Sequence, residues 1–182
     1  MMRMDIQTIY QKALKFAATK HSEAGQTVPG TNFPYVVHIC NVAMEIMVAA
    51  HHTNNFNLEL ALPVALLHDT LEDTNTNSDE LAELFGYEIA HGVMALTKDK
   101  SLPKEQQMKD CLMRIKLQPV AIWAVKLSDR ITNLQPPPLT WNEQKKIRYQ
   151  EEARTILREL KEGNEYLAIR LRSKIEEYSR FI

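Results

Sequence analysis

The sequence predicts an all-α protein, and three observations carry this prediction. Apolar residues recur at helical spacing along most of the chain, whereas the alternation that is typical of half-buried strands is nearly absent. Only five glycines occur among the 182 residues, so the helical pattern is seldom interrupted. The hydrophobic content of 45% is ordinary for a globular protein, and the length suffices for one domain with one buried core.

Periodicity, capping residues and turn residues together divide the chain into helices. These are expected over about residues 5–21, 35–50, 58–73, 77–86, 88–97, 108–118 and 119–134, followed by two charged amphipathic helices within 141–182 that break at Gly163–Asn164. Asn77 with Glu80 resembles a capping box, and Gly86 resembles a C-terminal stop. No internal repeat, low-complexity segment or linker interrupts the pattern, so we interpret residues 1–182 as a single domain.

The expected helix over residues 58–73 differs from the others because it is apolar on almost every side. Such a helix is predicted to lie at the centre of a bundle. Pro63 falls inside it, so we expect either a kink or a late start. The segment 25–34, between the first two helices, carries two glycines and two prolines and is predicted to be a loop.

Charge and cysteine content narrow the classes of function. The 22 basic and 23 acidic residues nearly cancel, so we expect neither a nucleic-acid partner nor a membrane surface. Cys40 and Cys111 are too far apart for a zinc knuckle or a redox pair and are expected to be small buried hydrophobes. The sequence shows no signal-peptide core and no apolar run of membrane-spanning length, which favours a cytoplasmic protein.

One segment carries chemistry-bearing residues on an otherwise apolar helix. His68, Asp69, Glu72 and Asp73 fall within six residues. Buried carboxylates and imidazoles are costly unless they are paired, hydrogen-bonded or bound to a metal ion. Helical spacing places His68 one turn from Glu72, and Asp69 one turn from Asp73. His68 and Asp69 are therefore candidates for holding a metal ion. Glu72 and Asp73, one turn farther along, are candidates for orienting a water molecule.

Two further residues in apolar helical settings are candidate metal ligands. They are His38, in the second expected helix, and Asp129, in the helix before the triple proline. Taken alone, His38 would more often be a hydrogen-bonded core residue, and Asp129 could simply pair with Arg130 or Lys126. Helices in a bundle can each supply one ligand to a central site. Two imidazoles and two carboxylates without sulfur suit a six-coordinate Mn, Fe or Mg ion with open water positions.

Glu72 and Asp73 would then handle protons, either by deprotonating the attacking water or by protonating the leaving oxygen. The sequence does not assign these two roles separately. The remaining histidines sit among polar or small residues and are predicted to lie on the surface; they are His21, His51, His52 and His91.

The ordered pattern of His38, then His68-Asp69, then Asp129 resembles the HD superfamily of metal-dependent phosphohydrolases. Its closer resemblance is to the RelA/SpoT-type alarmone hydrolase domain and its small stand-alone relatives. The stretches that carry the resemblance span about residues 8–135 and read PYVVHICNVA, VALLHDTLEDT, FGYEIAHGVMALTKDKSLPK and VKLSDRITNL. The combination HDxxED with a later KLxDRxxNL is much more specific than a bare HD pair.

The resemblance implies an HD-type helical bundle with a central Mn(II) ion. The implied ligands are His38, His68, Asp69 and Asp129, with Glu72 and Asp73 serving hydrolysis. It implies that guanosine tetra- or pentaphosphate loses its 3′-pyrophosphate. The implied substrate contacts are Lys100 and Asn133, which would meet phosphates or ribose, and Arg130, which matches a basic residue common after the last ligand.

The sequence departs from this family in one place and leaves alternatives open. Alarmone hydrolases usually carry basic residues just before the second helix, but here the loop reads GQTVPGTNFPY and contains none. An HD phosphohydrolase acting on another nucleotide or phosphate ester is therefore the second hypothesis. A metal- or nucleotide-binding regulatory module without turnover is the third, and a plain helical interaction protein the fourth. The 182 residues leave no room for a synthetase domain, and the C-terminal helices could form a homodimer contact.

Overall fold

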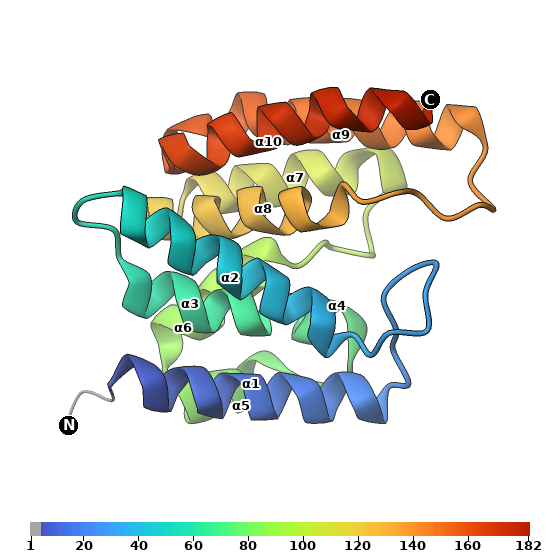
Figure 1. Cartoon of the computed structure of the whole chain (residues 1–182). Coiled ribbons are helices and arrows are strands. Elements are labelled where there is room, and N and C mark those ends of the chain that lie inside the picture. The colour runs from blue at the N-terminus through green and yellow to red at the C-terminus, as the bar shows by residue number, and fades with distance from the viewer. Residues whose placement is uncertain (1–4) are drawn as a thin grey trace.

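The computed structural model describes residues 5–182, which form a layered bundle of α-helices (Figure 1). The helices are α1 Ile6–Glu23, α2 Val36–His52, α3 Leu58–Leu67, α4 Thr70–Asp73, α5 Ser78–Phe85, α6 Tyr87–Leu96, α7 Lys104–Lys116, α8 Val120–Asn133, α9 Glu143–Leu160 and α10 Glu165–Tyr178. Within the described residues, strand pairing is limited to one isolated bridge between Thr27 and Pro34. The predicted all-α class is confirmed.

The bundle is arranged so that α3 lies inside it. Figure 1 shows α1 and α5 on one side, α9 and α10 on the opposite side, and α2, α3, α6 and α8 between them. Every residue of α3 from Leu60 to Leu67 is buried, as expected for a helix that is apolar all round. No helix in the range 5–182 has both the length and the apolar character needed to cross a bilayer.

The predicted helix over residues 58–73 is wrong as a single element, because it breaks at His68–Asp69. Thr70 Oγ1 donates to the carbonyl of Leu67 at 2.7 Å, and a ring nitrogen of His68 lies 2.8 Å from the carbonyl of Ala65. These side chains take carbonyls that the next helical turn would otherwise need. Asp69 adopts φ −101° and ψ −1°, and a single turn, α4, follows.

The start of α3 decides one of the two expectations for Pro63, because the helix does not start late. The helix begins at Leu58, where the side chain of Asn57 accepts a hydrogen bond from the amide of Leu60 at 3.2 Å. Pro63 therefore lies inside the helix and does not delay its start. Farther along, α7 begins at Lys104, directly after Pro103, which is earlier than the expected residue 108.

The predicted boundary signals around α5 are largely confirmed. Asn77 accepts a hydrogen bond from the amide of Glu80 at 2.9 Å, as an N-cap should. The Glu80 carboxylate instead pairs with Lys20 of α1 at 3.0 Å, so only half of a capping box forms. Gly86 ends the helix with φ 91°, a conformation that glycine adopts without strain.

The C-terminal helices pack on α8, and their junction is where the sequence predicted a break. A 3-10 turn, Lys161–Gly163, separates α9 from α10. Gly163 is pressed against α8, because a Cβ atom there would lie 2.5 Å from Cβ of Trp123 and 3.3 Å from the amide nitrogen of Ala124. Between α10 and α2, Arg170 forms two hydrogen bonds of 2.6 Å with the buried carboxylate of Glu45.

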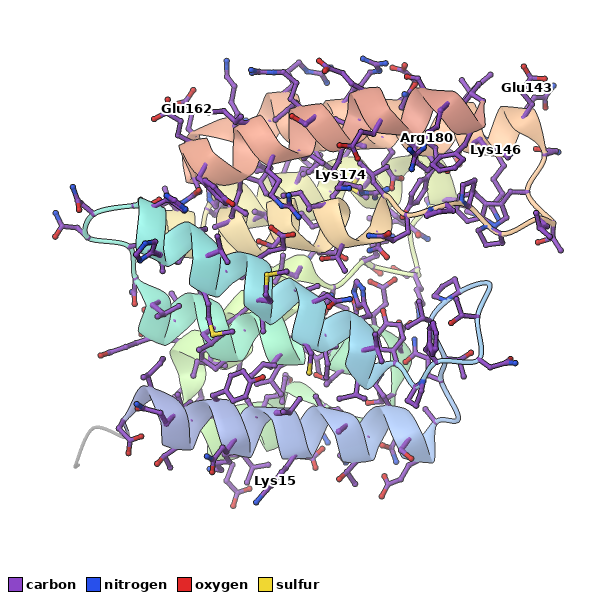
Figure 2. The ribbon with its side chains drawn as sticks, viewed as in Figure 1. Lys15, Glu143, Lys146, Glu162, Lys174 and Arg180 are labelled. Carbon is purple, nitrogen blue, oxygen red and sulfur yellow. The ribbon has the colours of Figure 1, made fainter. Side chains whose placement is uncertain are left out.

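Replacing Gly163 by alanine should therefore destabilise the fold. The added methyl group has no space, and overpacking of this kind costs about 1–3 kcal/mol. We expect the free energy of unfolding, measured by urea denaturation, to fall by that amount. Glu162→Ala is the matched control, because Glu162 is exposed next to Gly163. Figure 2 shows that the side chain of Glu162 points away from the bundle. Equal midpoints for Gly163→Ala and the parent protein would contradict the close contact with α8.

Candidate metal centre

Three elements bring the four predicted ligands to one spot. His38 comes from α2, His68 and Asp69 from the break between α3 and α4, and Asp129 from α8. Nε2 of His38 lies 3.3 Å from Nε2 of His68, 3.7 Å from Oδ2 of Asp69 and 3.5 Å from Oδ1 of Asp129. Nε2 of His68 lies 2.9 Å from Asp69 and 3.7 Å from Asp129. The donor atoms of His38, His68 and Asp69 thus all lie within 4.8 Å of one another, and Asp129 approaches this group through the two histidines. Each histidine offers the same ring nitrogen.

The hydrogen bond at the other side of the His68 ring fixes which nitrogen can bind a cation. Nδ1 of His68 faces the carbonyl of Ala65 at 2.8 Å. A carbonyl oxygen only accepts hydrogen bonds, so Nδ1 must carry a proton and donate. Nε2 is then the nitrogen whose lone pair is available to a metal ion, as is common for metal-binding histidines. The break after α3 therefore serves the site directly.

Both aspartates are held by neighbouring donors. Asp69 accepts a hydrogen bond from the hydroxyl of Tyr35 at 2.5 Å. Asp129 accepts from Nζ of Lys126 at 2.9 Å through one oxygen, and from the amide of Asn133 at 2.5 Å through the other. Supporting contacts of this kind orient metal ligands and tune their basicity. Tyr35 and Lys126 were missed by the sequence analysis as functional residues, although Lys126 lies one helical turn from Asp129.

The charges of the site are those of a cation-binding centre. Burial favours the neutral form of Asp129, but Lys126 and the two histidines hold the pKa of that carboxyl well below its usual range. His68 likewise lowers the pKa of Asp69 against the effect of burial. Burial alone would lower the pKa of His68, but Asp69 and Asp129 raise it to about 10. The two carboxylates are thus anionic, and they stabilise positive charge between them.

Metal binding should consequently release a proton. At neutral pH His68 is protonated in the metal-free protein, since its pKa is about 10, and a metal ligand must be deprotonated. Metal affinity should rise with pH, by about tenfold per unit, until the pH reaches the pKa of His68. Calorimetric titration with Mn(II) at pH 7.5, in buffers of different ionisation enthalpy, should give release of about one proton. Binding without proton release would contradict the assignment of His68 as a ligand.

Glu72 and Asp73 lie on the single turn α4, directly after the candidate ligands His68 and Asp69. The two carboxylates are held by different parts of the chain. Glu72 accepts a hydrogen bond from the backbone amide of Lys98 at 3.1 Å, whereas Asp73 accepts one from the side-chain amide of Gln26 at 2.9 Å. Lys100 donates to the backbone carbonyl of Glu72 at 2.5 Å and lies 4.0 Å from the Asp73 carboxylate.

The three residues expected to contact a substrate are placed differently. Lys100 is largely exposed beside Glu72 and Asp73, and Asn133 lies next to Asp129. Arg130 is only 4% exposed, pairs with Glu152 and stacks 4.4 Å above the ring of Tyr149. Arg130 thus supports the packing of α8 against α9, and its expected contact with a substrate stays a prediction.

Four histidines outside the metal centre were predicted to lie on the surface, and three of them do. His51, His52 and His91 are exposed. The prediction for His21 is wrong, because this side chain is 1% exposed at the end of α1. The loop that follows α1 folds back over it, and the side chain of Gln26 reaches Nδ1 of His21 at 2.5 Å.

A cavity of about 290 Å³ opens beside His38. Its walls come from α2, the end of α8, the triple proline and the C-terminal helices, and include Asn133, Trp141 and Tyr149. Figure 1 places loop 24–35 and loop 134–142 at the same end of the molecule as α4. The two loops touch there, since a Cβ at Gly30 would lie 3.0 Å from Pro138. Neither arginine nor lysine is among the residues that line the cavity.

A helical bundle that gathers two histidines and two aspartates from α2, α3–α4 and α8 is a helical fold with a candidate metal centre. The HD domain family matches residues 13–162, and the chain belongs to this family. It is 32% identical over 171 residues to a mouse protein named guanosine-3′,5′-bis(diphosphate) 3′-pyrophosphohydrolase MESH1. The aligned region covers 91% of this chain and 92% of the mouse protein.

Other relatives agree with this assignment. The MESH1 protein of Drosophila melanogaster is 29% identical over 166 residues, covering 89% of this chain and 90% of the fly protein. A solved structure described as a metazoan ortholog of SpoT that hydrolyses ppGpp superposes with a TM-score of 0.81 at 26% identity, over 97% of this chain and 98% of that one. The predicted family and helical fold are therefore confirmed.

Proposed function

We propose that this protein is a metal-dependent phosphohydrolase that removes the 3′-pyrophosphate from guanosine 3′,5′-bis(diphosphate). The observation that carries the proposal is the cluster of His38, His68 and Asp69, with Asp129 beside both histidines and two further carboxylates on the next turn. The substrate is suggested by relatives of nearly the same length that are named for this activity. A regulatory module without turnover would have no need for Glu72 and Asp73 beside the metal ligands.

The four donor groups fit one divalent ion, and manganese is the ion we propose. Two imidazole nitrogens and two carboxylates, without thiolate, suit a hard or borderline ion such as Mn(II). Such an ion, when bound, supplies Lewis acidity and makes water acidic enough to yield hydroxide near neutral pH. Lys126 and Asn133 keep the Asp129 carboxylate in place, and Tyr35 does the same for Asp69.

The proton transfers of the hydrolysis require side chains of this protein. The oxygen of water forms a bond to the phosphorus attached to the 3′ oxygen, and the bond between that phosphorus and the ribose 3′ oxygen breaks. The proton lost by water must be accepted, and the leaving 3′ oxygen must gain one. We assign these transfers to Glu72 and Asp73, whose carboxylates are held by the amide of Lys98 and by Gln26. Lys100, beside both residues, is placed to meet phosphate charge.

The nucleoside would enter the cavity beside His38. Aromatic and proline side chains make up much of its wall, and flat apolar surfaces of this kind suit a nucleobase and a ribose. Asn133 borders both this cavity and Asp129, so it could contact the ribose next to the reacting centre. Neither arginine nor lysine is among the residues that line the cavity, so we assign phosphate recognition to Lys100.

The test is a hydrolysis assay with the full chain, Mn(II) and guanosine tetraphosphate, beside a panel of other nucleotides and phosphate esters. Release of pyrophosphate from the alarmone, abolished by a chelator, is the expected result. The loop GQTVPGTNFPY, which carries no basic residue, favours another nucleotide as the second candidate. Cleavage of a panel member in place of the alarmone would establish that second candidate, and no cleavage of any compound would refute the proposed function.

A further inference from the structure

A buried histidine outside the metal centre is linked to the carboxylate of Asp73 through one intermediate side chain. His21, at the end of α1, approaches Oε1 of Gln26 with Nδ1 at 2.5 Å. Nε2 of Gln26 in turn approaches Oδ2 of Asp73 at 2.9 Å. We propose that His21 and Gln26 are positioning residues that act in series to aim the carboxylate of Asp73; this inference rests on the proposed function.

The chemistry of the three groups fixes the direction of both hydrogen bonds. A carboxylate only accepts hydrogen bonds, so the amide group of Gln26 must turn its NH₂ toward Asp73. The amide oxygen then faces His21, and because that oxygen only accepts, Nδ1 of His21 must donate. The amide cannot be flipped without opposing two oxygen atoms across a 2.9 Å gap. Each link therefore specifies the orientation of the next.

The surroundings of His21 keep this orientation in place. Its side chain is 1% exposed, and burial lowers its pKa, so the ring is neutral with one proton. Within residues 5–182, Nε2 of His21 has no hydrogen-bond partner, which leaves the bond at Nδ1 as the ring's polar contact. The ring also packs against Tyr35, with centroids 4.6 Å apart, and Tyr35 donates to the metal ligand Asp69.

The backbone holds Gln26 at the base of its loop. Its amide donates to the carbonyl of His21 at 3.0 Å, and its carbonyl accepts from the amide of Tyr35 at 3.3 Å. The side chain of Gln26 thus projects from a closed loop whose two ends are tied together. The Asp73 side chain is 32% exposed, so without Gln26 its carboxylate would keep, in the part of the chain that the structure describes, only the long 4.0 Å contact with the exposed Lys100. Small displacements of a reacting group can reduce turnover about a hundredfold.

Two substitutions at His21 separate hydrogen bonding from packing. His21→Phe keeps a ring against Tyr35 but removes the donor, whereas His21→Asn removes the ring and keeps an N–H donor near the position of Nδ1. We expect His21→Phe and Gln26→Met each to lower kcat by about 10- to 100-fold with little change in KM. His21→Asn should retain most of the parent kcat. Glu23→Gln, at an exposed position on the same helix, is the matched control and should match the parent protein.

The double variant His21→Phe with Gln26→Met tests whether the two residues act in series. If they do, its kcat should equal that of Gln26→Met alone, because the first link has no function once the second is lost. Multiplying effects in the double variant, or an unchanged kcat in Gln26→Met, would overturn the proposal. If the parent protein hydrolyses another nucleotide of the panel in place of the alarmone, the kcat values of the variants can be compared with that nucleotide.

A second readout needs no substrate and separates this inference from the proposed function. The side-chain amide signal of Gln26, identified by its absence in Gln26→Met, can be followed by ¹H–¹⁵N NMR of the full chain. It should shift in both His21→Phe and Asp73→Asn and stay in place in Glu23→Gln. An unchanged signal in His21→Phe would overturn the inference even for an active enzyme. Failure of the parent protein to hydrolyse any nucleotide would refute the proposed function, while this signal still decides whether the three residues are linked.

Discussion

An Asp69→Ala variant should lose its metal ion and its hydrolase activity together. Oδ2 of Asp69 lies 2.9 Å from Nε2 of His68 and 3.7 Å from Nε2 of His38. Its removal also deprives the hydroxyl of Tyr35 of its acceptor. Loss of the metal removes several kcal/mol of transition-state stabilisation, which corresponds to a fall in kcat/KM of about a thousandfold.

The measurement for Asp69→Ala is the ratio of bound manganese to protein, together with kcat/KM. Asp79→Ala is a suitable control, because Asp79 is an exposed aspartate in the first turn of α5 and lies outside the ligand set. The control should retain both metal and turnover. An Asp69→Ala protein that holds stoichiometric manganese would show that Asp69 is not a ligand.

Glu72→Gln should give the opposite combination, with metal retained and turnover lost. The amide oxygen of glutamine can still accept the hydrogen bond from the amide of Lys98, so α4 and the neighbouring ligands keep their positions. The ionisable carboxylate is nevertheless gone, and proton transfer by a positioned side chain is worth about 10²- to 10⁴-fold. We expect kcat to fall by that factor.

Metal content and single-turnover rates together measure this effect. Glu83→Gln, at an exposed position on α5, makes the same chemical change away from the site and should leave both quantities unchanged. If Glu72→Gln turned over at the parent rate, Glu72 would not handle a proton, and Asp73 would have to serve alone.

Local patterns in the sequence were sufficient to predict most of the helices and the two ends of α5. Asn77 and Gly86 act where they were expected, because capping depends on residues within one turn of each other. The break between α3 and α4 was not predictable from periodicity, since helical spacing alone is compatible with one helix that carries His68 and Asp69 on one turn and Glu72 and Asp73 on the next. It depends on Thr70 and His68 bonding to the carbonyls of Leu67 and Ala65, which compete with the next helical turn.

The candidate ligands were predictable from residue type and setting, whereas the groups around them were not. His38 and Asp129 stood out as titratable residues in apolar helices, and the fold brings both to His68. His21 was misread because its sequence neighbours, Lys20 and Ser22, are polar, although the following loop buries it. The contact between Gln26 and Asp73 joins residues 47 positions apart, and no local pattern encodes it.

The most direct test of the account is the position of the metal. Crystals of the protein loaded with Mn(II) should show one strong anomalous diffraction peak at the manganese edge. We predict that this peak lies within bonding distance of His38, His68, Asp69 and Asp129, with the carboxylates of Glu72 and Asp73 nearby but not bound. A peak elsewhere on the chain, or one coordinated without Asp129, would contradict the proposed centre.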